Sequence, residues 1–482
     1  MGTTQMRDCA KRQRRVFAVL LLCLASWSAS ARTADPTLRA EHYVQSEMRL
    51  QRIPGLSLAV LKHGKPLYIK AFGNASLEWP VPVKPNTRFQ IGSIGKQFTA
   101  VAVMLMVQEH RLSLDAPLAN YLPEVPAAWR EVTLRRMLNH QSGIAQLTVP
   151  PHNLLDLHHD YTDAEYLQLA SSVPLDFKPG TAAAYSDTAY VLLGIVLNRV
   201  SGAFYGDLLE GRVFQRLGMR RTRILSDVEI IPGRASGYVK RADGTLENQS
   251  WVAAALNRTA DGSLYSTVLD LSRWDAALYG DRVLPQVELQ RMWRVDPLVD
   301  GRQPLYHYGY GWEINSLRGH PVIEYDGNWQ GFQAAMARYT DRQLSVIVLT
   351  NLALCRTQRI AHTIAGIFDA SIAPHGNSAR DLSPELTLQF RNLLADPIRG
   401  GVDQRRFHSS VRERYAAPWR EALAGELQDV GPIGVIELAE ERRLAANTER
   451  VYRVETRDIT EWFTVLYDHD SLIHQIDLYR EF

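Results

Sequence analysis

The sequence predicts an α+β fold, in which an antiparallel β-sheet is flanked by helices and a helical lobe is inserted between its strands. Three observations lead to this prediction. Short apolar or alternating runs occur near residue 60 and again after residue 320, a mainly helical stretch separates them, and a turn signal joins the first two runs. Strands from both ends of such a unit can meet in one antiparallel sheet that packs against helices.

The first two strands are expected at residues 55–60 and 66–72. His63 and Gly64 lie between them, and a polar pair with glycine at this position is typical of a β-hairpin. Turn residues separate three later runs, which predict further strands at residues 322–325, 333–339 and 344–350.

Helices are expected where apolar residues recur every three to four positions. Such a pattern begins near Ser93 and continues to about Glu109. A second pattern covers residues 190–200 and is closed by Ser201 and Gly202, because glycine commonly ends a helix. Residues 358–371 form a third, amphipathic pattern.

A change in composition predicts where this main unit ends. Residues 373–382 are small, polar or turn-forming and are expected to be a linker. Beyond them, residues 383–425 have a helical pattern, and four short apolar runs follow at residues 435–439, 451–456, 462–468 and 471–478. We therefore predict a main domain at residues 32–372 and a small C-terminal α+β accessory domain at residues 383–482.

Residues 1–31 have the layout of a secretory signal peptide. A basic cluster precedes an apolar run at residues 16–25, and Ala29-Ser30-Ala31 is a small-residue cleavage pattern. A membrane anchor is the alternative, but the run is too short to span a bilayer comfortably. We expect a protein exported to the periplasm or secreted, with no stable membrane anchor. Cleavage removes five basic residues and one acidic residue, so the net charge becomes +2 − 4 = −2.

The cysteines, the basic residues and the known binding motifs limit the partners that the protein is expected to have. Cys9 and Cys23 lie in the predicted signal peptide, so only Cys355 remains and no internal disulfide can form. The chain contains no block of basic residues, which argues against nucleic acid as a partner. The expected partner is a small-molecule or peptide substrate. No metal-binding motif or phosphate-binding loop is present in the sequence, and we predict no metal and no organic cofactor.

One sequence motif could supply a nucleophile and a general base. Ser93 and Lys96 form the only Ser-x-x-Lys sequence in a chain that has 8 Lys against 46 Arg. A spacing of three places both side chains on one face of a helix. The positive end of the helix dipole and the apolar neighbours favour the neutral amine that a general base needs. The alternative is a helix-capping serine beside a surface lysine.

Two further segments could complete a site. In Tyr185-Ser186-Asp187, the tyrosine could share the proton of a serine nucleophile, or it could simply pack at the start of the next helix, with Asp187 as its cap. In the segment 324–332, an edge strand around Gly327 and Asn328 could present a backbone N–H to a substrate carbonyl oxygen. An ordinary hairpin with a tryptophan plug is the alternative.

The order of these three segments resembles the serine β-lactamase-related superfamily, which also holds penicillin-binding proteins, and most closely its class C-like esterase and peptidase branch. The similarity runs from about Ile53 to Asp369 and is broad. It includes Gly92-Ser93-Ile94-Gly95-Lys96 within residues 87–99. The other shared segments, in chain order, are residues 53–57, 133–143, 214–219, 235–238, 262–267, 308–312 and 349–351.

The resemblance implies a function and roles for these residues. It implies an exported serine hydrolase that acts through an acyl-enzyme on Ser93. Lys96 and Tyr185 would share the role of general base, and the backbone N–H groups of Ser93 and Asn328 would form the oxyanion hole. A β-lactamase or D-alanyl carboxypeptidase is one alternative. A weakly active or non-catalytic protein that binds peptides or peptidoglycan is another.

Two positions depart from the family's pattern. Asp187 stands where the family usually has Asn, and an ionised carboxylate cannot donate a hydrogen bond to a substrate carbonyl. Asp187 would instead favour the charged form of Lys96 and weaken it as a base. Tyr325-Asp326-Gly327 replaces the usual Lys-Thr-Gly or His-x-Gly, so the lysine that would attract a substrate carboxylate is missing. We therefore expect Tyr325, Gly327 and Asp187 to line a substrate site for an uncharged ester or amide.

Overall fold

The computed structural model describes residues 35–482 except for short stretches at 242, 305, 374–378, 400–402, 413–431, 445–446, 457–459 and 482. The predicted signal peptide at residues 1–31 and the middle of the predicted linker at 373–382 lie outside the described residues. The chain divides into two compact units after Tyr43, and helix α2 (Pro36–Gln51) spans that point. The description below concerns Val44–Phe482.

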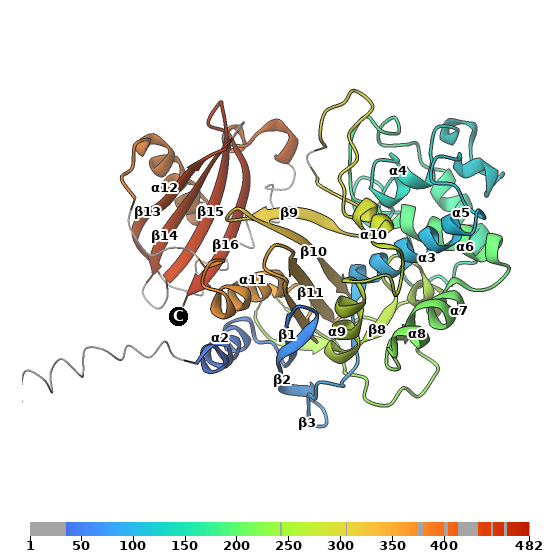
Figure 1. Ribbon diagram of the computed structural model, residues 1–482, viewed down its shortest axis with the longest axis horizontal. Helices are drawn as coiled ribbons and strands as arrows, with labels where there is room; N and C mark the ends of the chain where they lie inside the picture. Colours follow the sequence, from blue (N-terminus) through green and yellow to red (C-terminus); the bar gives the residue numbers. More distant parts are fainter. Residues whose placement is uncertain are drawn as a thin grey trace, which may run out of the picture. The chain divides into compact units, whose positions relative to one another are not determined.

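A seven-stranded antiparallel sheet forms the centre of the fold, with the strand order β3-β2-β1-β12-β11-β10-β9 (Figure 1). Its strands come from both ends of the main unit, which confirms the predicted fold class. The strands are β1 (Gly55–Lys62), β2 (Lys65–Ser76), β3 (Val81–Pro82), β9 (Glu313–Leu317), β10 (His320–Trp329), β11 (Phe332–Tyr339) and β12 (Leu344–Thr350).

The hairpin between β1 and β2 turns at the predicted residues. His63 has φ of 53° and Gly64 has φ of 68°. A two-residue turn with positive φ at both positions matches the right-handed twist of the strands that it joins. Lys62 pairs with Lys65 across this turn, so the turn fixes the register of the whole hairpin.

Helices cover both faces of the sheet. Arg338 and Tyr339 are neighbours in β11, so their side chains point to opposite faces. Arg338 donates a hydrogen bond to Asp275 of α9 (Val268–Ala277), and the Tyr339 hydroxyl bonds to His362 of α11 (Thr357–Phe368). Helices α9 and α11 therefore lie on opposite faces. The predicted helix at residues 358–371 corresponds to α11, which ends three residues earlier.

The segment between β3 and β9 is the predicted helical block. Its longest helix is α6 (Asp187–Ser201), which begins three residues before the predicted start at residue 190. The Ser186 side chain accepts a hydrogen bond from the Ala189 N–H, so Ser186 and not Asp187 caps this helix. Besides α9, the other α-helices described here are α3 (Lys96–Gln108), α4 (Leu134–Leu138), α5 (Asp163–Ser171), α7 (Tyr205–Leu209), α8 (Gln215–Leu217) and α10 (Gln286–Met292).

Two small sheets join this block to the rest of the main unit. The first contains β4 (Phe89–Gln90), β8 (Leu264–Ser266) and β5 (Arg223–Ile224), with β8 in the middle. It holds the chain just before Ser93 beside the loop that precedes β8, because Gln90 pairs with Tyr265. The second contains β6 (Tyr238–Lys240) and β7 (Leu246–Asn248).

The C-terminal region contains the predicted strand meander, whereas within the described residues the helical pattern predicted over residues 383–425 forms one helix that ends at Arg399 and is followed by short 3-10 turns up to Val411. Helix α12 spans Pro384–Arg399, and a four-stranded antiparallel sheet has its strands in chain order. Phe390 stacks on Tyr452 within an apolar cluster that belongs to this region alone. That residues 383–482 are a domain of their own remains a prediction. The strands are β13 (Ile433–Arg443), β14 (Asn447–Thr456), β15 (Thr460–Asp468) and β16 (Ile473–Glu481).

No single helix in the described part of the chain is long and apolar enough to cross a bilayer, and α6 with the segment Tyr205–Leu217 meets the criterion only as a pair bent by 80°. Residues 188–197 of α6 are buried in the main apolar core.

Candidate active site

Ser93 lies in a tight turn between a short strand and a helix. The turn is a 3-10 helix at Gly92–Gly95, and α3 begins directly after it at Lys96. The sequence predicts a continuous helix from Ser93. The first turn is instead a 3-10 helix, which is wound more tightly, and Gly92 enters it with a positive φ of 50°. Ser93 and Lys96 still face each other across this turn.

Close backbone contacts fix the position of Ser93. A Cβ atom on Gly327 of β10 would lie 2.0 Å from the Ile91 carbonyl oxygen and 2.8 Å from the Ser93 nitrogen. A Cβ atom on Gly92 would lie 2.7 Å from the Asn328 nitrogen. These contacts require glycine at both positions. They also bring the backbone nitrogens of Ser93 and Asn328 to the same edge of β10.

Two side chains, those of Lys96 and Tyr185, contact the Ser93 hydroxyl. The Lys96 Nζ donates a hydrogen bond to Ser93 Oγ over 3.0 Å, and the Tyr185 hydroxyl lies 2.7 Å from the same oxygen. Tyr185 also donates a hydrogen bond to Asp187 Oδ1 over 2.7 Å. Since that hydroxyl has one proton to donate, the Ser93 O–H donates to Tyr185. The predicted trio of Ser93, Lys96 and Tyr185 is therefore assembled in space.

Lys96 is completely buried and has three hydrogen-bond acceptors. Its Nζ lies 3.0 Å from Ser93 Oγ, 2.5 Å from Asp187 Oδ1 and 2.7 Å from the Asp261 carbonyl oxygen. Three acceptors match the three donors of an ammonium group. Burial opposes the ionisation of Asp187, but the Lys96 charge and hydrogen bonds from Lys96, Tyr185 and Gln146 hold the pKa of Asp187 below its usual value.

Tyr185 keeps its proton in this environment. Burial, followed by the charge of Asp187, raises the pKa of Tyr185 well above its ordinary value. A neutral tyrosine can accept the Ser93 proton while it passes its own proton to a neighbour, but it cannot serve as a standing phenolate base. The arrangement thus links Ser93 to Asp187 through one hydroxyl.

Sequence reasoning missed two residues that hold this arrangement together. The Gln146 amide accepts from the Asp187 N–H and donates to Asp187 Oδ2, both over 2.7 Å. His140 accepts a hydrogen bond from the Ser186 N–H, and its ring lies 4.8 Å from the Tyr185 ring. Burial, with the Lys96 charge, lowers the pKa of His140 to about 3. His140 lies in the shared segment 133–143, but nothing in the sequence marks Gln146.

The three residues predicted near the end of β10 differ from one another in how they lie relative to the cleft. Asn328 lines the cleft, and its side chain donates to Gln333 Oε1 over 2.6 Å. Gly327 is buried and serves close backbone packing. Tyr325 is only 3% exposed and lies beside Tyr308 in the aromatic core. Tyr325 is not among the residues that line the cleft beside Ser93, and its place in the substrate site stays a prediction.

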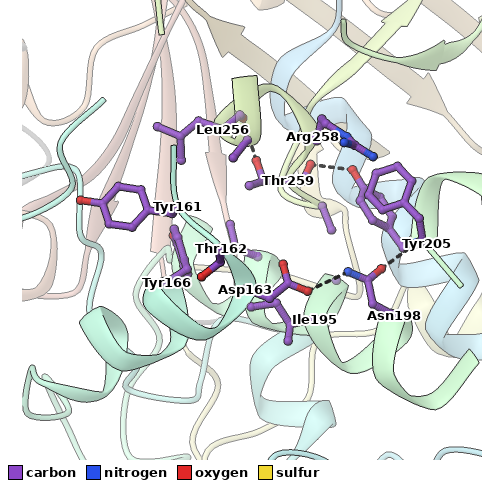
Figure 2. A pocket seen from close by; sticks show the side chains of 15 residues that line it. Tyr161, Thr162, Asp163, Tyr166, Ile195, Asn198, Tyr205, Leu256, Arg258 and Thr259 are labelled. Carbon is purple, nitrogen blue, oxygen red and sulfur yellow. Dashed lines mark hydrogen bonds between the residues drawn. The ribbon is translucent and has the colours of Figure 1, made fainter. Parts of the chain in front are cut away.

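A cleft of about 140 Å³ opens beside Ser93. A second cavity of about 290 Å³ adjoins it, and the two share Tyr166, Val191, Leu256 and Thr259 as wall residues. Figure 2 shows this second cavity, with the hydrogen bond from Asn198 to Asp163 at one side. Its wall is largely aromatic and aliphatic. The cleft wall itself contains Ser93, Gln146, Asp187, Asp261, Asn328 and Trp329, among others.

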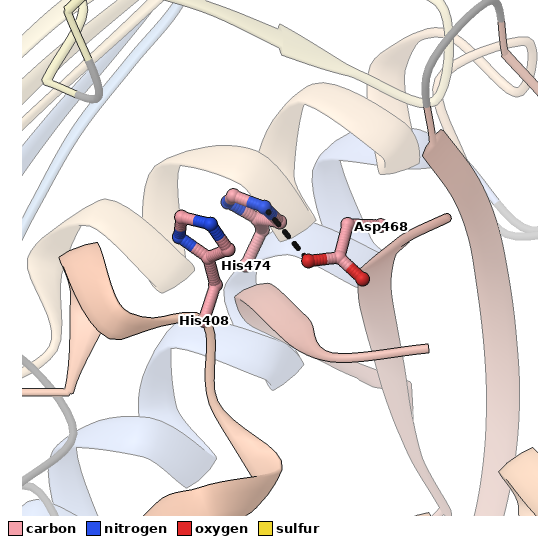
Figure 3. A group of neighbouring side chains, drawn as sticks. All are labelled: His408, Asp468 and His474. Atoms are coloured by element: carbon pink, nitrogen blue, oxygen red, sulfur yellow. Dashed lines mark ion pairs between the residues drawn. The ribbon is translucent and has the colours of Figure 1, made fainter. Parts of the chain in front are cut away.

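One group of side chains could hold a metal ion. His408, Asp468 and His474 each offer a ligand atom, and these atoms lie within 4.8 Å of one another (Figure 3). His474 forms an ion pair with Asp468 over 3.4 Å, and the two imidazole rings stack at 4.3 Å. All three residues belong to the C-terminal region, and none takes part in the contacts around Ser93.

Comparisons with known proteins agree with this geometry. The Beta-lactamase family model matches residues 40–361. Penicillin-binding protein 4* of Bacillus subtilis (strain 168) is 29% identical over 301 residues, which are 60% of this chain and 66% of that protein. D-aminopeptidase of Gluconobacter oxydans (strain 621H) is 26% identical over 303 residues, which are 62% of this chain and 56% of that protein. The chain thus matches less than two thirds of the length of either relative.

A solved structure extends the likeness in fold. The octameric penicillin-binding protein homologue from Pyrococcus abyssi aligns with a TM-score of 0.62 at 23% sequence identity. The alignment covers 92% of this chain and 98% of that one. The shared fold therefore reaches beyond the segment that the family model matches.

Proposed function

Because the chain belongs to the beta-lactamase family, and is a serine hydrolase of that family, we propose that it cleaves an uncharged ester or amide through an acyl-enzyme on Ser93. One observation carries this proposal. Ser93 Oγ lies within hydrogen-bond distance of both Lys96 Nζ and the Tyr185 hydroxyl, at 3.0 and 2.7 Å. A hydroxyl in such a setting can lose its proton as it attacks a carbonyl carbon.

The proposed reaction has two halves. In the first, Ser93 Oγ bonds to the carbonyl carbon, and its proton enters the hydrogen-bonded group of Lys96 and Tyr185. The backbone N–H groups of Ser93 and Asn328 stabilise the oxyanion. A proton then returns from the same group to the leaving oxygen or nitrogen as its bond to carbon breaks. In the second half, water attacks the acyl-enzyme, and the acid leaves as Ser93 regains its proton.

The charges around Ser93 support a substrate that has no carboxylate. Asp187 and Asp261 are the charged side chains in the cleft wall among the described residues. A substrate carboxylate placed there would be repelled, so β-lactams and peptides that end in D-alanine fit poorly. The name of the D-aminopeptidase relative gives an amide bond as one candidate.

A covalent probe tests the proposed nucleophile. A fluorophosphonate should label the wild-type protein and the Ser93→Ala variant should remain unlabelled. Ser316→Ala is the matched control, because Ser316 is exposed in β9, and it should be labelled like the wild type. If the folded wild type resists the probe, the protein is a binding protein and the proposal fails. Rapid hydrolysis of a chromogenic cephalosporin would contradict the expected substrate class.

We also propose that residues 1–31 direct export and are removed. The support is the sequence pattern of a basic cluster, a short apolar run and Ala29-Ser30-Ala31. Mass spectrometry of the protein recovered from a periplasmic or culture fraction should find Arg32 at the N-terminus. Recovery of the uncleaved chain in the membrane fraction would instead indicate an anchor.

A further inference from the structure

The cleft beside Ser93 has an acidic wall. Among the described residues that line it, Asp187 and Asp261 are the only ones with ionisable acidic or basic side chains. The remaining wall residues are polar or apolar. A small cavity with low-dielectric walls concentrates the field of the charges that it contains. The two carboxylates differ, however, in what surrounds them.

Asp187 is fully engaged within the protein. Its Oδ1 accepts hydrogen bonds from Lys96 and Tyr185, and its Oδ2 accepts from Gln146. The positive charge of Lys96 lies against it at 2.5 Å. Asp187 therefore has little negative charge left to offer a substrate.

Asp261 is less fully engaged, although its carboxylate feels the charge of Lys96 and a hydrogen bond from Thr259. Lys96 bonds to the carbonyl oxygen of Asp261 and not to its carboxylate. The Oδ1 atom is buried and has no hydrogen-bond partner among the described residues. Burial, together with the charge of Asp187, raises the pKa of Asp261 to about 6. At neutral pH the group is still mostly ionised, and a carboxylate oxygen that is buried without a hydrogen-bond partner is costly unless a cation meets it.

The backbone at Asp261 lies close to the Ser93 turn, and both residues line the same small cleft. Gly262 follows Asp261 directly, and a Cβ atom on Gly262 would lie 2.6 Å from the Gly92 carbonyl carbon and 3.0 Å from the Ser93 nitrogen. The pairing of β4 with β8 fixes this approach. A group bound at Asp261 therefore belongs to the part of the substrate next to the scissile carbonyl.

We propose that Asp261 is a specificity-determining residue that binds a primary ammonium group next to the scissile carbonyl of the substrate. The preferred substrates are then esters or amides of an amino acid with a free amino group. This inference rests on the proposed function of Ser93. It sharpens the uncharged substrate proposed above, because the bond that is cleaved stays neutral while the group beside it carries a positive charge.

Binding to an inactive protein tests the inference independently of catalysis. In the Ser93→Ala protein, alanine amide and 2-methylpropanamide form a matched pair, because they differ only by an ammonium group in place of a methyl group. Calorimetric titration should give at least a tenfold lower Kd for alanine amide, in its D or L form. Adding Asp261→Asn should reduce that ratio to about one. Adding Asp207→Asn, at an exposed position in α7, should leave the ratio as it is.

Each other outcome has a defined meaning. Equal affinity for the two amides, or no binding of alanine amide, would overturn the inference. A preference that survives Asp261→Asn would also overturn it and would point to Asp187. The fluorophosphonate experiment reports on Ser93 alone. Failure of the fluorophosphonate labelling would therefore count against Ser93 as the nucleophile, whereas failure of the amide titration would count against Asp261 as the ammonium site.

Discussion

Lys96 Nζ lies 2.5 Å from Asp187 Oδ1, closer than it lies to the Ser93 hydroxyl that it would deprotonate. The carboxylate and the amine form an ion pair inside the site. Proton transfer from Ser93 then competes with this ion pair. The same carboxylate accepts the Tyr185 hydroxyl proton in a hydrogen bond, so the site contains two routes by which a proton can leave Ser93.

Asp187→Asn separates these two routes. The substitution removes the ion pair with Lys96 but keeps a side-chain oxygen that can accept the Tyr185 hydrogen bond, so the Lys96 amine is released from its carboxylate partner and kcat should change only through the Lys96 route. The full pH profile of ester hydrolysis measures this, with Asp207→Asn as the control. Loss of activity at every pH would show instead that the Asp187 carboxylate is itself the proton acceptor.

Gly327→Ala should damage both the fold and the site. Its Cβ would lie 2.0 Å from the Ile91 carbonyl oxygen, so β10 must move away from the Ser93 turn. Overpacking of this kind typically costs about 1–3 kcal/mol of the free energy of unfolding. The urea concentration at the midpoint of unfolding and the rate of fluorophosphonate labelling should both decrease. Gly211→Ala meets nothing within 4 Å and should leave both unchanged. Equal effects of the two variants would contradict the prediction.

His140 should make the protein less stable in acid. Its pKa of about 3 in the folded protein lies below the ordinary value of 6.5. The unfolded chain therefore binds a proton that the folded protein excludes, and stability falls as the pH drops from about 6.5 towards 3. The loss attributable to His140 is about 2 kcal/mol at pH 5.

Variants at two histidines measure this contribution. Urea unfolding at pH 7.5 and at pH 5.0 gives the acid-induced loss for each protein. His140→Gln should lose about 2 kcal/mol less than the wild type between the two pH values. His158, whose side chain is 63% exposed, serves as the control, and His158→Gln should lose as much as the wild type. Identical losses in all three proteins would exclude His140 as the cause.

The buried ion pair between Arg338 and Asp275 should be costly to break from one side. Arg338 Nε lies 2.7 Å from Asp275 Oδ1, and their side chains are 3% and 0% exposed. Asp275→Leu leaves the guanidinium unpaired, which should cost about 3–5 kcal/mol. Adding Arg338→Met should recover part of that loss. Asp300→Ala, in an exposed pair with Arg302, should cost less than about 1 kcal/mol. A double variant with a lower free energy of unfolding than Asp275→Leu alone would contradict this account.

Local signals in the sequence predicted the parts of the fold that depend on neighbours in the chain. The run at residues 344–350 coincides with β12, and His63-Gly64 marks the first hairpin. The spacing of Ser93 and Lys96 places them together because a single helical turn links them. These features need no knowledge of distant segments.

The remainder of the site depends on contacts between distant loops. Gln146 reaches Asp187 across 41 positions, and the Asp261 carbonyl reaches Lys96 across 165. No periodicity or motif encodes such contacts. The burial of Tyr325 has the same origin. A tyrosine in a strand can face water or core, and only the packing of Tyr308 against it decides.

The pairing of β1 with β12 has a consequence for the newly made chain. Leu56 pairs with Thr350, 350 − 56 = 294 positions later. At about 5–20 residues per second, synthesis takes about 15–60 s to cover that interval. Until then, the hairpin of β1 and β2 emerges from the ribosome with one hydrogen-bonding edge unfilled, and that edge can recruit a strand from another nascent chain. The seven-stranded sheet is therefore completed late, and its first hairpin needs protection while it waits.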